Sequence, residues 1–194
     1  MKSFRIVLAV AAFAALSAPA AAQLTGDPAQ QFIDAVQKRD GDTATQLIET
    51  HPTLVDTRNG KGDTGLLVAI RAADPNWTGF LLNKGADPNL PGANGDTPLI
   101  AAAKAGFDDA VPWLLGLGAK VNSTNRAGET ALIIAVQQRD TRLVRTLLNA
   151  GADPDRTDHV AGYSARDYAN RDNRARDIQK LINDRVPKSS PAAN

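Results

Sequence analysis

The sequence repeats itself with a period of 33 residues. Thr64, Thr97 and Thr130 are separated by this step, and three further sets of small residues keep the same spacing. These sets are Gly62, Gly95 and Gly128, then Ala69, Ala102 and Ala135, then Gly85, Gly118 and Gly151. A period of this length indicates a solenoid, in which each unit buries its apolar face only by stacking on its neighbours.

One copy of the repeat, residues 94–124, predicts a pair of helices. Thr97-Pro98 is a helix start, because threonine can cap free N–H groups and proline suits the first helical position. Gly106 permits a reversal, and Gly118 supplies a left-handed stop after the second helix. Leu115, in the apolar stripe of that second helix, is expected to lie between its own repeat and both neighbours.

The repeats also share their closing sequences, GADPN at 85–89, GAKVN at 118–122 and GADPD at 151–155. Together with the threonine, alanine and leucine positions, this pattern resembles the ankyrin repeat, whose consensus runs G-x-T-P-L-H-x-A-A, then a leucine pair, then G-A-D-x-N. The chain departs from the consensus histidine, which is replaced by Leu67, Ile100 and Ile133. The departure exchanges a hydrogen-bonding group between repeats for apolar contact.

The resemblance implies an all-α ankyrin-repeat solenoid over residues 27–184, built from about five helix-turn-helix repeats. The expected repeats span residues 27–58, 59–91, 92–124, 125–157 and 158–184, and the first and last are degenerate capping repeats. In the closing repeat Arg166 replaces a buried leucine. Trp113 aligns with Phe80 beside the leucine pair and is expected in the core.

The N-terminus has the features of a secretory signal peptide, residues 1–22. Lys2 and Arg5 precede an uncharged apolar stretch at 6–16, and Ala20–Ala22 fits a peptidase site, so cleavage is expected before Gln23. The alternative, an uncleaved membrane anchor, is disfavoured because a spanning helix needs about 20 apolar residues. We therefore expect a periplasmic protein that is not inserted in the membrane, with an extracellular location as the weaker alternative. Residues 185–194 are expected to form a disordered tail.

Residues suited to catalysis or metal binding are few. The chain has no cysteine, and its two histidines, His51 and His159, fall in different repeats. No nucleophile elbow or zinc-binding H-E-x-x-H motif is present. We expect no enzyme activity, no cofactor and no metal site. Without Lys2 and Arg5 the chain has 20 basic and 21 acidic residues, which does not favour nucleic acid as a partner.

The resemblance implies that the chain binds another protein, of unknown identity, as a monomer. In ankyrin-repeat proteins the partner lies against the fingers between repeats and the exposed side of the first helices, which line a concave groove. The matching positions here are Lys61, Asp63, Arg71, Asn94, Asp96, Lys104, Arg126, Glu129, Gln137, Gln138, Tyr163 and Arg171. They form an acidic row along the fingers and a largely basic row along the helices. The alternative is that the two rows pair locally.

Two other functions remain open from the sequence. The first is a small-ligand-binding or atypical enzymatic protein with a pocket near Trp77, although a structural place over the second-helix layer is favoured for this side chain. The second is a structural subunit that docks through the apolar face of the second helices.

Overall fold

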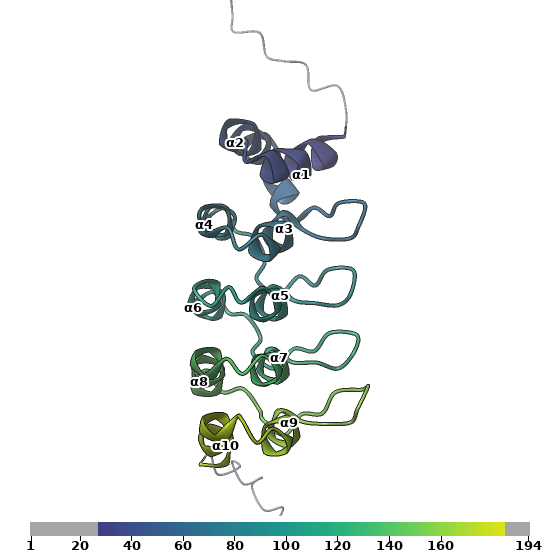
Figure 1. The fold of residues 1–194 in the computed structure, drawn as a ribbon. Coiled ribbons are helices and arrows are strands. Elements are labelled where there is room, and N and C mark those ends of the chain that lie inside the picture. Colours follow the sequence, from purple (N-terminus) through teal and green to yellow (C-terminus); the bar gives the residue numbers. More distant parts are fainter. Residues whose placement is uncertain (1–26, 185–194) are drawn as a thin grey trace, which may run out of the picture.

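The computed structural model describes residues 27–184, and within this range the chain forms ten α-helices and one short 3₁₀ helix (Figure 1). The predicted signal peptide and the predicted C-terminal tail lie outside the described residues. No helix in this range combines the length and the apolar character needed to cross a bilayer. The helices are α1 Pro28–Lys38, α2 Gly41–Thr50, η1 Pro52–Asp56, α3 Gly65–Arg71, α4 Pro75–Asn83, α5 Pro98–Ala105, α6 Ala110–Gly116, α7 Ala131–Gln137, α8 Thr141–Asn149, α9 Ala165–Arg171 and α10 Arg176–Asn183.

The helices stack in two columns. The odd-numbered α-helices, which open the repeats, form one column, and the even-numbered helices form the second (Figure 1). A loop projects beside each of α3, α5, α7 and α9, on the side away from the second column. This arrangement confirms the predicted all-α solenoid.

We call these loops the fingers, and each is closed by a backbone hydrogen bond between its ends. In the first three the bond joins residues four apart, as from Asn125 N to Glu129 O at 3.1 Å. In the last finger it runs from Asp158 N to Tyr163 O at 3.0 Å, so this loop is one residue longer. The fingers are therefore residues 59–63, 92–96, 125–129 and 158–163. Because of the extra residue, Ser164 follows Thr130 by 34 residues and not by 33.

Hydroxyl side chains start the first helices of the four repeats with fingers, as the period predicts. The Thr64, Thr97 and Thr130 hydroxyls accept hydrogen bonds from the backbone N–H groups three residues later, at 3.2–3.4 Å. Ser164 occupies the same place in the closing repeat and forms a capping box with Asp167. These contacts satisfy N–H groups that have no partner inside the helix.

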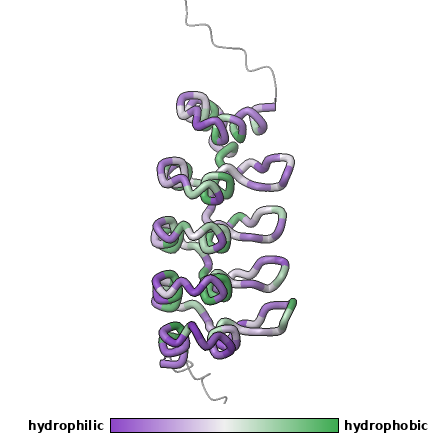
Figure 2. The backbone as a smooth tube through the Cα atoms, viewed as in Figure 1, coloured by the Kyte–Doolittle hydropathy of each residue, from purple (hydrophilic) through white to green (hydrophobic). Residues whose placement is uncertain are grey.

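The core runs along the first helices and the inner side of the second helices. All of α7 except Gln137 is buried. Figure 2 shows hydrophobic residues concentrated on α5 and α7, whereas α10 is largely hydrophilic, as a terminal helix requires for solubility. Trp77 also belongs to this core, with 8% of its surface exposed and its ring edge-on to Phe80 at 5.1 Å.

Two predictions about the core are wrong. Trp113 is 40% exposed, because it lies on the outer side of α6, where no third layer of helices covers it. Leu115 is only half-buried, and the fully buried leucine of this helix is Leu114. Leu114 and Leu115 are the leucine pair of this repeat, and both lie on α6, but Leu114 is the more deeply buried.

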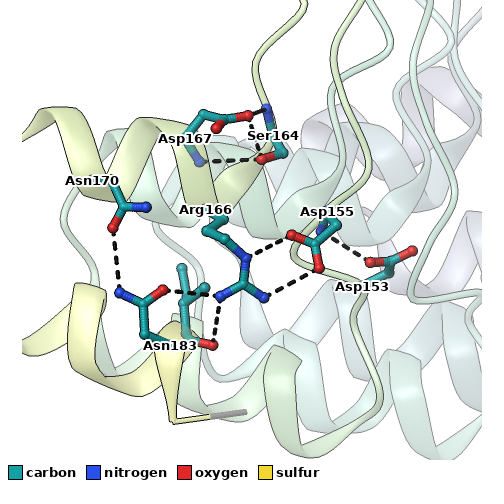
Figure 3. A network of polar contacts seen from close by, with 8 residues as sticks. Asp153, Asp155, Ser164, Arg166, Asp167, Asn170 and Asn183 are labelled. Atoms are coloured by element: carbon teal, nitrogen blue, oxygen red, sulfur yellow. Dashed lines mark hydrogen bonds and ion pairs between the residues drawn. The ribbon is translucent and has the colours of Figure 1, made fainter. Parts of the chain in front are cut away.

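Asparagine and aspartate side chains connect successive repeats at the closing sequences. Asn89 accepts a hydrogen bond from the backbone N–H of Lys120 at 2.8 Å, and Asn122 accepts one from Asp153 at the same distance. Asp56 binds the N–H of Asp87 in the same way at 2.9 Å. The next position of this series, Asp155, is instead bound by Arg166 of the closing repeat (Figure 3).

Candidate functional site

The twelve residues predicted to bind a partner all lie on the fingers or in the last turns of the first helices and the residues that follow them. We call this side of the molecule the finger face. Figure 1 shows that the fingers project in parallel beside α3, α5, α7 and α9, so that they share one side of the solenoid. The contacts on this face differ from the two rows of exposed charges predicted from the sequence.

The first pair of charges neutralises itself. Arg71 Nη1 and Asp63 Oδ2 form an ion pair between the end of α3 and the base of the first finger. The Asp63 side chain is 9% exposed and the Arg71 side chain 38%, so the carboxylate lies below the surface and the guanidinium covers it. Asp63 was predicted to face a partner, but in the structure its carboxylate is buried and paired with Arg71.

The second set of charges forms a network across two repeats. Lys104 Nζ lies 2.8 Å from Asp96 Oδ1 and 3.5 Å from Glu129 Oε2. Asn125 Nδ2 donates to the same two carboxylates, at 2.9 and 2.8 Å. Asp96 is only 5% exposed. The alternative of local pairing is therefore correct for Arg71 and Lys104, because a finger carboxylate lies within reach of a basic residue eight positions later.

Asp158 stabilises the last finger, and the sequence analysis did not select it. It accepts hydrogen bonds from the hydroxyl of Tyr168 at 2.6 Å and from three backbone N–H groups of the finger at 2.6–3.1 Å. Burial of Asp158 opposes its ionisation, but these hydrogen bonds together lower its pKa. The hydrogen bond that Tyr168 donates to Asp158 is the main cause that raises the pKa of Tyr168, and burial is the second cause. The repeat period could have identified Asp158, because Asn59, Gly92, Asn125 and Asp158 occupy one repeat position.

Three residues of the predicted set remain available at the finger tips. The side chains of Lys61, Asn94 and Arg126 are exposed and form no hydrogen bond or ion pair with the part of the chain that the structure describes. They lie in three successive fingers. Because their side chains have no partner here, they are the groups on this face best able to bind another molecule.

Of the remaining predicted residues, Gln137, Gln138 and Arg171 are exposed and Tyr163 is half-buried. Gln138 Nε2 donates to the Lys104 carbonyl at 3.3 Å. The Arg171 guanidinium lies over the Tyr163 ring, 4.5 Å from its centroid. Such a stacked guanidinium keeps its hydrogen-bonding edge free for a partner.

Backbone hydrogen bonds hold neighbouring fingers together. Arg126 N donates to Asn94 O at 3.2 Å, and His159 N donates to Ala127 O at 2.7 Å. A glycine is required at the second junction, because a Cβ on Gly128 would lie 2.7 Å from His159 N. The last three fingers therefore form one connected surface in the absence of a partner.

The region near Trp77 does contain a hollow, of about 400 Å³. It is lined in part by Arg39 and Asp74, but Arg39 Nη2 and Asp74 Oδ2 form an ion pair at 2.8 Å, and Asp74 also caps α4. Trp77 itself lies in the core. Within residues 27–184 no three histidine or acidic side chains are grouped so that they could hold a metal ion.

Comparison with models of known protein families gives a match to ankyrin repeats, in a model of three copies, over residues 32–125 and 66–158. These two overlapping matches cover more than half of the chain. A comparison with curated proteins gives no significant match.

Proposed function

Because the chain belongs to the ankyrin-repeat family, we propose that it is a non-catalytic module that binds another protein through the finger face. Ankyrin repeats are generally protein–protein interaction modules. The finger face corresponds to the side on which a partner is expected from the resemblance. The observation that carries the proposal is the row of three unpaired polar side chains, Lys61, Asn94 and Arg126, on three successive fingers, of which the second and third are joined by a backbone hydrogen bond.

The connection between fingers favours binding by a preformed surface. A loop that must become ordered on binding loses conformational entropy, which reduces the affinity. Here the backbone bonds from Arg126 to Asn94 and from His159 to Ala127 already hold the last three fingers at a fixed spacing. We therefore expect little rearrangement of the fingers between the free and bound protein.

The available charges indicate the chemistry of the partner. Lys61, Arg126 and Arg171 are exposed cations on the finger face, whereas the carboxylates Asp63 and Asp96 are buried. The complement is an acidic or carbonyl-rich protein surface. Attraction between exposed charges falls off over about 8 Å at physiological ionic strength, so binding should weaken as salt is added.

We also propose that this binding takes place in the bacterial periplasm, with the protein a monomer. The basis is the signal-like sequence of residues 1–22, with its basic start, apolar stretch and alanine-rich end. The nearly balanced charge supports a protein partner over nucleic acid.

The test is capture of a partner from periplasmic extract with the tagged protein. We expect one partner in stoichiometric amount, and at least tenfold weaker capture by the double variant Lys61→Glu and Arg126→Glu. Arg71 and Lys104 are unsuitable for this test, because replacing them leaves a buried carboxylate without its cation.

The matched control is Lys84→Glu with Arg145→Glu, two exposed cations on the side of the second helices. This pair should leave capture through the fingers unchanged. If the control pair abolishes capture and the finger pair does not, the partner uses the opposite side and the proposal is wrong.

A further inference from the structure

The outer side of α4 and α6 contains an apolar groove of about 390 Å³. We call it the outer groove, and its lining includes Leu82, Pro112, Trp113 and Leu117. Figure 1 places α4 and α6 in the column of second helices, on the side opposite the fingers. Trp113 and Leu117 are 40% and 54% exposed, so two large apolar side chains face solvent on this side of the solenoid.

The repeats provide an internal control for this groove. At the positions of Trp113, Gly116 and Leu117, the next second helix, α8, carries Thr146, Asn149 and Ala150. Arg145 of α8 stands at the position of Pro112. The solenoid therefore does not require apolar residues at these outward positions, and α6 differs from its neighbour in having no polar group there.

Two glycines leave the groove open. Gly79, inside α4, and Gly116, at the end of α6, do not have positive φ angles, and a Cβ on either would meet no atom within 4 Å. Neither backbone conformation nor packing explains them, and glycine within a helix is unfavourable relative to alanine. Because they have no side chain, the two glycines leave the groove open.

The groove also has an aromatic side chain that packs against a neighbouring ring. The Trp113 ring lies edge-on to Phe107, with 6.3 Å between ring centroids and 88° between ring planes. Tryptophan residues that are already held in place contribute strongly to protein interfaces, because little side-chain freedom is lost on binding.

Two exposed cations occupy positions equivalent to residues that line the groove. Lys84 of the α4 repeat stands at the position of Leu117 and directly follows the lining residue Asn83, and Arg145 of α8 stands at the position of Pro112. The Lys84 Nζ lies 5.7 Å from the Phe80 ring centroid. No acidic residue occupies residues 79, 80, 83 and 84 or their equivalents 33 and 66 positions later. The exposed carboxylate one turn before Trp113, Asp109, lies 3.5 Å from Arg142. A partner with apolar side chains flanked by carboxylates would complement both the apolar groove and the two cations.

We propose that the outer groove binds an acidic amphipathic helix of a partner protein. The groove is shallow and open, so it cannot enclose a small molecule as a ligand pocket does. It lies between helices whose backbone groups are bonded internally, so an extended segment would find no strand edge to pair with. A helix satisfies its own backbone groups and can place one apolar face over Trp113 and Leu117.

The probe is a 14-residue peptide with leucines at helical spacing on one face and glutamates on the other, and its binding is followed by fluorescence anisotropy. We expect at least tenfold weaker binding for Trp113→Ala and for Lys84→Glu with Arg145→Glu. A peptide with lysine in place of each glutamate should bind at least tenfold more weakly. The finger variant Lys61→Glu with Arg126→Glu should bind like the native protein, which separates this proposal from that of the finger face.

The decisive variant is Gly79→Gln. It places a side chain in the groove and removes a helix glycine, so the melting temperature should rise while peptide binding falls at least tenfold. Loss of folding cannot produce this combination. Equal binding of the acidic and basic peptides, or unchanged binding by Gly79→Gln, would overturn the proposal. So would concentration-dependent dimers in sedimentation that Leu117→Lys abolishes, because a second copy would then occupy the groove.

Discussion

Arg166 binds Asp155 through two hydrogen bonds, from Nε to Oδ1 at 2.6 Å and from Nη2 to Oδ2 at 3.2 Å. Its Nη1 donates to the Ile182 carbonyl at 3.2 Å and to Asn183 Oδ1 at 2.9 Å, at the end of α10 (Figure 3). The hydrogen bond with Asp155 is the main cause that raises the pKa of Arg166. One side chain thus connects the preceding repeat to the last helix.

Replacement of Arg166 by alanine should loosen the closing repeat. The Arg166 side chain is 22% exposed and that of Asp155 is 48% exposed, so solvent weakens the pair, and we expect a loss of about 1–2 kcal/mol. Hydrogen exchange should show lost protection in α9 and α10 and unchanged protection in α5 and α7. Arg156→Ala, at an exposed neighbour, is the control. Equal loss of protection along the whole solenoid would contradict this local role.

The two leucines of α6 should differ in their effect on stability. Leu114 is fully buried, so Leu114→Ala should cost about 2–5 kcal/mol through lost burial and a cavity. Leu115 is half-buried, and Leu115→Ala should cost about 1–2 kcal/mol. Urea unfolding of the two variants measures the difference. A larger loss of stability for Leu115→Ala would contradict the greater burial of Leu114.

Asp108 should destabilise the folded protein when it is ionised, so its contribution to stability is more favourable in acid than at neutral pH. Burial, and then the neighbouring Asp140, raise the pKa of Asp108 above its usual range. A folded-state pKa above the unfolded value means that stability is lost as the pH rises through the folded pKa. Asp108→Asn should therefore raise the melting temperature at pH 7 and change it little in acid, where Asp108 is protonated in both the folded and the unfolded state.

Asp109→Asn is the control for this effect. The Asp109 side chain is 71% exposed and lies 3.5 Å from Arg142, so its replacement should not stabilise the protein. Thermal melts of both variants between pH 3 and pH 8 provide the measurement. If Asp108→Asn melts below the native protein at pH 7, the ionised Asp108 carboxylate does not destabilise the folded state.

Export should remove the first 22 residues. Lys2 and Arg5, the apolar stretch 6–16 and Ala20–Ala22 predict cleavage before Gln23. Mass spectrometry of protein recovered from the periplasm should find an N-terminus within one or two residues of Gln23. Recovery of only the full-length chain in the membrane fraction would instead support an uncleaved anchor.

The helical architecture could be predicted because each boundary has a local cause. Thr97 and Pro98 start a helix, and Gly118 ends one with a left-handed conformation, wherever the unit stands in the solenoid. The 33-residue step then repeats these local choices along the chain. The family model matches residues 32–158, in agreement with this interpretation.

The charge pairing of the candidate site could not be predicted in the same way. Asp63 and Arg71 are eight residues apart, and only the path of the finger brings their side chains together. The exposure of Trp113 was also hidden, because alignment with Phe80 gives the position on the helix but not how far a larger ring extends past it. Tertiary contacts decide both features, whereas the repeat pattern records mainly local structure.

The bonds that Asn89 and Asn122 make to the following repeat have a consequence for how the gene can change. If residues 90–122 were excised, Asn89 would stand 31 positions before Asp153, the same separation it now has from Lys120. The connection between repeats would be re-formed without any other substitution. The chain can therefore gain or lose whole inner units during evolution, whereas the closing unit, with its longer finger and its Arg166, has no interchangeable copy.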